Sequence, residues 1–195
     1  MLASSKHPMK DRGHSTETWP APAADLRRPV IRSAEEADAL RARVLGNANL
    51  TAARLRDFAG SPLELLTALH FQKEGHDPIT GKPLNIMEQV NQTCTILVSL
   101  RAVVQLLAMH PDANGFELAL ATSSGRDIKS VKPDLVAAEA FSATHPGSNQ
   151  KLKKDLDCLQ SDPARYRYVF FAAPACESGL FRETEPGIKV YCVEI

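Results

Sequence analysis

The chain has 195 residues, of which 44% are hydrophobic and 24% charged, and its 23 basic and 23 acidic residues give a formal net charge of zero. This length suits one domain with a sizeable core, and the composition is that of a soluble globular protein. Zero net charge argues against a strongly cationic protein that coats nucleic acid, but it is compatible with a local basic groove.

Simple sequence features disfavour several classes of protein. The N-terminal segment lacks the apolar core of a secretory signal, and no run of about 18 apolar residues predicts a membrane span. The four cysteines are widely spaced and form no C-x-x-C pair, which disfavours a zinc site and indicates free thiols in a reducing compartment. We therefore expect a cytoplasmic protein that does not contact a membrane.

The composition changes along the chain and predicts its organisation. Residues 1–30 are rich in Ser, His, Pro and charge and lack apolar periodicity, which predicts a flexible N-terminal arm. Residues 31–195 predict a single α/β domain with a helical half over 31–110 and a sheet over 115–195. We expect neither half to fold alone.

Two S-x-x-E capping boxes mark helix starts in the first half. Ser33 with Glu36 predicts a helix to about Leu45, where "GNAN" interrupts it before "LTAARLRDFAG" resumes the helical pattern. Ser61 with Glu64 predicts a second helix, and the turn-rich loop "HDPITGKP" follows it. The long apolar segment that begins with "LNIMEQV" predicts a third helix, which stops before a proline.

The second half reads as strands and one helix. "FELALAT", "IKSV" and "DLVAAEAFSA" predict three consecutive strands, the last buried on both faces. Ser148 predicts the N-cap of a helix through "NQKLKKDLDCLQ", and "RYRYVFFAAP" and "GIKVYCVEI" predict two more strands. The expected fold is α/β: a helical N-terminal half packed on a small mixed sheet of about five strands with a crossover helix.

One carboxylate stands in an otherwise apolar strand. Glu139 lies in "LVAAEAF", where burying its charge is costly without a cation, a metal or hydrogen bonds. A hairpin could bring Asp127, just before the preceding strand, beside Glu139. Two adjacent carboxylates repel unless a hard cation such as Mg²⁺ or Mn²⁺ neutralises them. Such an ion activates water and stabilises charge on a phosphodiester.

This arrangement resembles the PD-(D/E)XK nuclease superfamily, whose restriction-endonuclease-like core has the order α-β-β-β-α-β. The resemblance covers about residues 85–175 and implies a metal-dependent endonuclease with Asp127 and Glu139 as metal ligands and the Ala140 carbonyl as a backbone ligand. The literal Pro133-Asp134 pair fits less well, because only four residues separate it from the glutamate.

The chain departs from the family at the third motif residue. The family carries a lysine two positions after the glutamate, and Phe141 stands there in this chain. Lys151, in the first turn of the following helix, is the candidate replacement. The alternatives are an inactive binding or regulatory module in which Phe141 fills the catalytic cavity and a Lys or Arg holds Glu139, or an unrelated α/β interaction protein in which Glu139 forms a buried ion pair.

Two further groups of residues are candidates for the site. Glu88, Gln92, Thr95 and Ser99 share one stripe of the long helix, which either faces solvent or lines a polar cleft. Glu88 resembles the glutamate that the restriction-like fold supplies from the helix before its sheet.

Basic residues could bind nucleic acid around the same sheet. These phosphate-binding candidates are Lys153, Lys154, Arg165 and Arg167, with a solvated surface as the alternative. We expect a nucleic-acid partner, with DNA favoured, and a homodimer, because cutting both strands requires two sites.

Overall fold

The computed structural model describes residues 26–121, 124–145, 147–174, 176–184 and 187–195 of the chain. Its helices are α1 (Ala34–Arg56), α2 (Pro62–Phe71), α3 (Ile86–Met109) and α4 (Lys151–Gln160). A separate hairpin pairs β2 (Gly75–His76) with β3 (Pro83–Leu84). The remaining strands form one sheet: β1 (Val30–Ile31), β4 (Phe116–Leu118), β5 (Ile128–Ser130), β6 (Val136–Ser142), β7 (Tyr166–Ala172), β8 (Gly179–Thr184) and β9 (Ile188–Cys192).

The sheet has the order β1-β4-β5-β6-β7-β9-β8. Strands β4, β5 and β6 form an antiparallel meander, α4 crosses over to β7, and β6, β7 and β9 are parallel. The prediction of an α/β fold with a mixed sheet is confirmed. The predicted number of about five strands is wrong, because seven strands pair in the described part of the chain.

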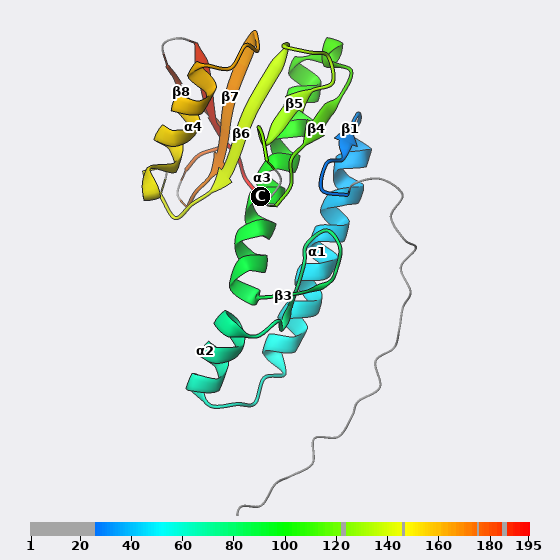
Figure 1. Cartoon of the computed structure of the whole chain (residues 1–195), viewed down its shortest axis with the longest axis vertical. Coiled ribbons are helices and arrows are strands. Elements are labelled where there is room, and N and C mark those ends of the chain that lie inside the picture. The colour runs from blue at the N-terminus through cyan, green and yellow to red at the C-terminus, as the bar shows by residue number, and fades with distance from the viewer. Residues whose placement is uncertain (1–25, 122–123, 146, 175, 185–186) are drawn as a thin grey trace, which may run out of the picture.

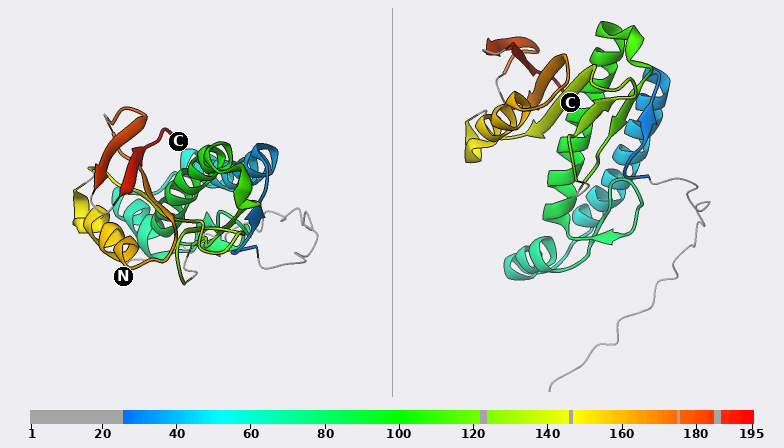
Figure 2. Two further views of the ribbon diagram at one scale, coloured as in Figure 1. Left: turned by 90° about the horizontal axis from the view of Figure 1, so that it is seen from above. Right: turned by 45° about the horizontal axis from the view of Figure 1, so that its top comes forward.

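The sheet separates two helical layers. Figures 1 and 2 show α3 on one face of the sheet, with α1 alongside it, and α4 on the other face. A hydrophobic core lies on each face of the sheet, and alternate residues of β6 contribute to them. Ala138 and Ala140 pack on the α3 side, whereas Ala137 and Phe141 pack on the α4 side. A strand with apolar residues on both faces needs helices on both faces, and the layers follow from that.

The two strands of this seven-stranded sheet that the sequence did not predict lie at its edges. Strand β1 has two residues, and β8 is exposed along nearly its whole length, including Leu180 and Phe181. Neither therefore carries the run of buried apolar residues that identifies a strand in a sequence.

Residues 26–30, which we expected in the N-terminal arm, pack on the domain. The amide of Leu118 donates to the carbonyl of Pro29, and the amide of Leu120 donates to that of Arg27. The arm prediction is therefore wrong for these residues, because their backbone pairs with the sheet. The rest of the predicted arm, residues 1–25, lies outside the described residues.

Helix α1 runs without a break through "GNAN", where we expected an interruption. The Asn47 side chain donates hydrogen bonds to the carbonyls of Asp77 and Pro78 in the hairpin loop. Val44 and Thr51 on either side are buried. Contacts with a distant part of the chain therefore outweigh the low helix propensity of this stretch.

Helix α4 begins differently from the prediction. Ser148 starts a short 3₁₀ turn rather than capping the helix, and the N-cap is Gln150, in the left-handed conformation (φ 54°) with no side-chain cap. The first turn contains Lys151, Lys153 and Lys154 and no acidic residue. This is an unfavourable start, because the N-terminus of a helix carries partial positive charge.

Helix α3 is long and apolar enough to cross a membrane by length and composition, although the sequence had predicted no such span. In the structure it packs between α1 and the sheet. A central core helix meets the same criteria, so this feature alone does not indicate a membrane span.

Candidate functional site

The β5–β6 pairing brings the two predicted carboxylates together. Ile128 lies opposite Ala138, and the same antiparallel register continued by one residue places Asp127 opposite Glu139. Residues directly opposite each other on such strands share a face. Asp127 Oδ2 also accepts a hydrogen bond of 2.9 Å from the Ala140 amide, which fixes this carboxylate at the end of the strand pair.

Glu139 is buried, with only 6% of its surface exposed, on the face of β6 that packs against α4. Burial, followed by the negative charges of Asp127 and Asp155, raises the pKa of Glu139 from 4.5 to about 8. A hydrogen bond from Arg126 acts in the opposite direction without outweighing burial. The carboxylates therefore repel one another at a buried position, and a further cation would relieve that repulsion.

Arg126 is the cation that contacts Glu139. Its guanidinium donates to Glu139 Oε1 at 3.2 Å, to Asp162 Oδ2 at 2.7 Å and to the Cys158 carbonyl at 2.6 Å. The shorter carboxylate contact is with Asp162, at the end of α4. Arg126 is thus anchored mainly at α4 and reaches Glu139 with one nitrogen.

Lys151 lies on the side of α4 that faces the carboxylates. Its ammonium donates to Asp155 Oδ1 at 2.5 Å, and its side chain is 43% exposed. Burial lowers the pKa of Lys151, but the hydrogen bond and charge of Asp155 outweigh this effect and raise it. The charges of Asp127 and Glu139 act in the same direction. The following helix therefore supplies a lysine within electrostatic range of the acidic pair.

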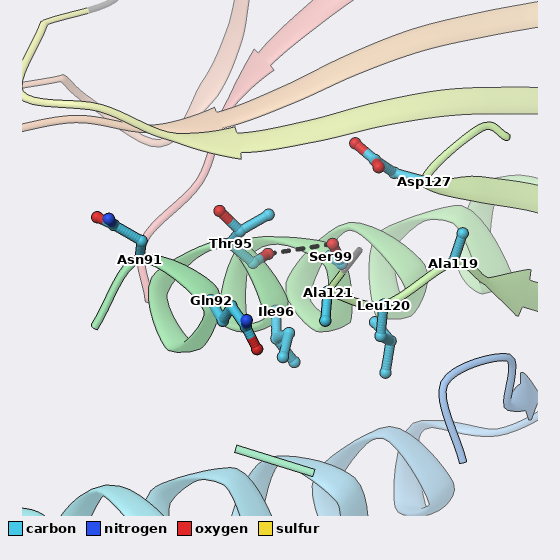
Figure 3. A pocket seen from close by; sticks show the side chains of 9 residues that line it. All are labelled: Asn91, Gln92, Thr95, Ile96, Ser99, Ala119, Leu120, Ala121 and Asp127. Atoms are coloured by element: carbon cyan, nitrogen blue, oxygen red, sulfur yellow. Dashed lines mark hydrogen bonds between the residues drawn. The ribbon is translucent and has the colours of Figure 1, made fainter. Parts of the chain in front are cut away.

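A pocket of about 220 Å³ opens beside Asp127 on the other face of the sheet. Gln92, Thr95 and Ser99 of α3 line it, together with residues 119–121. Figure 3 shows the Thr95 side chain on the side of α3 that faces Asp127, with the Ser99 hydroxyl donating to the Thr95 carbonyl. Asp127 lines this pocket and also belongs to the carboxylate pair, whereas Glu139 does not line the pocket, so a ligand there would contact the pair through Asp127 alone.

Glu88 does not join this group. It is exposed in the first turn of α3, where its carboxylate accepts a hydrogen bond of 2.9 Å from Gln92. The same helical stripe thus starts in solvent and ends in the pocket. The structure does not bring Glu88 together with the pocket residues, because Glu88 is not among those that line it.

The predicted phosphate-binding residues do not form one surface. Lys153 and Lys154 are exposed near the start of α4. Arg167 donates to the carbonyls of Leu159 and Gln160 and so stabilises the opposite end of that helix. Arg165 is exposed with its guanidinium over the Tyr166 ring. The two arginines therefore lie away from the two lysines, and only the lysines are near Lys151.

Phe141, two residues after Glu139, is part of the core. It is 3% exposed and stacks on Phe171 with ring centroids 5.7 Å apart. No polar group is available at that position of β6, so a cationic function there must come from another element.

No three His, Cys, Asp or Glu side chains among the described residues are grouped so that they could hold a metal ion. A magnesium site commonly needs fewer, because Mg²⁺ retains several waters and binds through one or two carboxylates. Asp127 and Glu139 could supply these carboxylates, and the Ala140 backbone lies beside them. Hard oxygen ligands of this type suit Mg²⁺ or Mn²⁺.

Sequence reasoning missed Arg126 and Asp155. A signal for Asp155 was present, because it lies between Leu152 and Leu159 on the apolar stripe of α4, where a charge is unexpected. Arg126 directly precedes Asp127 but carried no distinguishing pattern.

Comparisons with known proteins add no relative. No family model matches the chain, and neither the curated proteins nor the solved structures yielded a match. Function must therefore be inferred from the geometry of the residues around Glu139.

Proposed function

We propose that this chain is a divalent-metal-dependent nuclease that hydrolyses phosphodiester bonds of nucleic acid. One observation carries the proposal: Asp127 lies opposite Glu139 at the end of two paired strands, and Lys151 of the next helix lies within electrostatic range of both. The sequence of elements α3-β4-β5-β6-α4-β7 supports it, since this order and the antiparallel-to-parallel change at β6 are those expected of a restriction-endonuclease-like core.

The residues suit this chemistry. A Mg²⁺ or Mn²⁺ ion would supply charge neutralisation and a water of lowered pKa. Asp127 and Glu139 would hold it, with the Ala140 carbonyl as the proposed third ligand. Lys151 would orient the water and stabilise negative charge on the phosphate, the role that the family gives to its motif lysine.

Other parts of the site suit a nucleic-acid chain. Lys153 and Lys154 add positive charge at the start of α4, where the free backbone amides of a helix also favour phosphate. The amide of Gln92 and the hydroxyl of Thr95 could contact a nucleotide in the neighbouring pocket. If the substrate is double-stranded DNA, a homodimer would supply the two sites that cutting both strands requires.

A second candidate function is an inactive nuclease-fold module that binds protein or nucleic acid. Arg126 favours it, because its bond to Glu139 is the contact expected when a buried carboxylate is neutralised by an internal cation. The burial of Phe141 is compatible with both functions. Whether a metal binds at Glu139 distinguishes them.

The test is cleavage of labelled single-stranded DNA, double-stranded DNA and RNA with millimolar Mg²⁺ or Mn²⁺, and with a chelator. We expect metal-dependent cleavage that Glu139→Gln and Asp127→Asn abolish. Lys151→Ala should lower kcat by about 10²–10⁴, the usual contribution of a group that positions or transfers a proton.

Asp157→Asn and Lys73→Ala are the matched controls, because each removes one charge at an exposed position outside the site. Both should cleave like the unchanged protein. Absence of cleavage in every substrate, together with no metal binding in a calorimetric titration, would reject the nuclease and favour the module. An oligomeric state measured by light scattering in the same buffer tests the dimer.

A further inference from the structure

The ion pair between Lys151 and Asp155 differs from an ordinary surface pair. Asp155 is only 4% exposed, and its Oδ1 lies 2.5 Å from the Lys151 ammonium. Its second oxygen, Oδ2, is buried and has no hydrogen-bond partner among the described residues. Leaving such an oxygen unpaired costs about 1–3 kcal/mol. A pair that only stabilised the helix would not require this cost.

The local physics of α4 also argues against a purely structural pair. The favourable order for a pair four residues apart places the acid before the base, and here the lysine comes first. A cation in the first turn is further opposed by the partial positive charge of the helix N-terminus. The stability of α4 therefore does not explain why Lys151 and Asp155 stand at these positions.

The surroundings of Asp155 connect it to the carboxylate pair. The negative charge of Asp155 helps to raise the pKa of Glu139, and the negative charge of Asp127 helps to raise the pKa of Asp155. Burial raises the pKa of Asp155 above its ordinary value despite the bond to Lys151. Asp155 is thus within electrostatic range of the carboxylate pair and holds Lys151 through Oδ1.

We propose that Asp155 is a positioning residue for phosphodiester hydrolysis, which holds Lys151 through Oδ1 and accepts a hydrogen bond through Oδ2 from water bound at Asp127 and Glu139. This inference rests on the proposed nuclease function. Asp155 exchanges no proton or electron pair: it fixes the direction of the Lys151 ammonium and of the water. Carboxylates that orient a metal-bound water or ligand in this way commonly change activity about 10–100-fold when removed.

The experiment is a double-mutant cycle on full-length protein with Mn²⁺ and labelled DNA. Asp155→Asn preserves shape but removes the charge, and it should lower kcat by about 10–100-fold with KM nearly unchanged. Lys151→Ala should lower kcat at least as much. Because part of the effect of Asp155 passes through Lys151, the rate loss of the double variant should be smaller than the product of the two single losses, which a merely structural role would not produce.

Asp157→Asn, on the exposed side of the same helix, is the control and should cleave normally. Additive losses in the double variant, or normal kcat in Asp155→Asn, would overturn the role of Asp155 while the nuclease function stands. If the unchanged protein does not cleave any of the substrates, the nuclease function itself is rejected.

Lys151→Met provides a second variant in case Asp155→Asn does not fold. The Lys151 side chain is partly exposed, so this replacement should leave the fold intact. If Lys151→Met is fully active, Lys151 has no part in the reaction and the positioning role of Asp155 is wrong.

Discussion

At the scale of single residues, Glu139 is the feature that most constrains the protein. It lies in a strand whose other residues are apolar, and the nearest cation, Arg126, shares its guanidinium with Asp162. Burial and the neighbouring carboxylates therefore decide the state of Glu139 rather than the arginine. A buried group whose pKa is displaced this far often marks a functional site.

We predict that Glu139→Gln changes how stability depends on pH in metal-free protein. The pKa of Glu139 rises from 4.5 to about 8 on folding, so its proton stabilises the fold fully below about pH 4.5, and this contribution is lost as pH rises through about 8. A tenfold change in proton affinity corresponds to about 1.4 kcal/mol. As the pH rises from about 5 to about 8.5, the free energy of unfolding should therefore fall less for Glu139→Gln than for the unchanged protein.

Urea denaturation with a chelator across this pH range measures the difference. Asp155 contributes a slope of the same sign in both proteins, because its pKa is also raised. Glu177→Gln, at an exposed position, should keep the pH dependence of the unchanged protein. Parallel curves for Glu139→Gln and the unchanged protein would show that Glu139 is already ionised in the fold at neutral pH.

At the scale of elements, a buried polar network joins α1, the β2–β3 hairpin and α3. Gln89 Oε1 accepts hydrogen bonds from the Thr51 hydroxyl at 2.7 Å and the His76 amide at 2.8 Å, and Gln89 Nε2 donates to the Asn47 carbonyl. Asp77 accepts from Arg27 and from two amides of its own loop. These bonds hold an otherwise irregular loop against two helices.

Gln89→Ala should destabilise the fold by about 1–3 kcal/mol, because the Thr51 hydroxyl and the His76 amide lose a buried acceptor. Urea denaturation measures this change, and Gln72→Ala, exposed just after α2, is the control and should change stability little. Equal stability of Gln89→Ala and the unchanged protein would show that the network only accompanies packing made by other residues.

At the scale of the whole molecule, α3 connects the helical half to the sheet. It packs on α1 along one side and on β6 and β7 along another, and Leu106 and Val103 are fully buried between these layers. The expectation of one domain whose halves do not fold alone is consistent with this shared core, since removing either half would expose α3.

Leu106→Ala should lower the free energy of unfolding by about 2–5 kcal/mol through the cavity that it leaves. Helical circular dichroism and hydrogen exchange of the sheet should then report one transition, because both halves share α3. Leu63→Ala, at a position 73% exposed, should have little effect. Separate transitions for helices and sheet would show two independent folding units.

The sequence by itself determined the elements whose signals are local. Ser33 caps α1 and Ser61 forms its capping box with Glu64, because a cap depends on residues within one turn. The apolar runs identified β6, β7 and β9, since a strand buried on both faces needs few polar residues. The same local reasoning predicted that a hairpin could bring Asp127 beside Glu139, and the observed register of β5 and β6 places the two opposite each other.

Only the tertiary structure decided what surrounds them. The continuity of α1 through Asn47, the pairing of Arg126 with Glu139, the burial of Asp155 and the separation of Glu88 from the site all depend on contacts between elements distant in sequence. A helical stripe or a charge pattern gives the face on which a side chain lies, but the neighbouring elements decide whether that face meets solvent, a cation or another carboxylate.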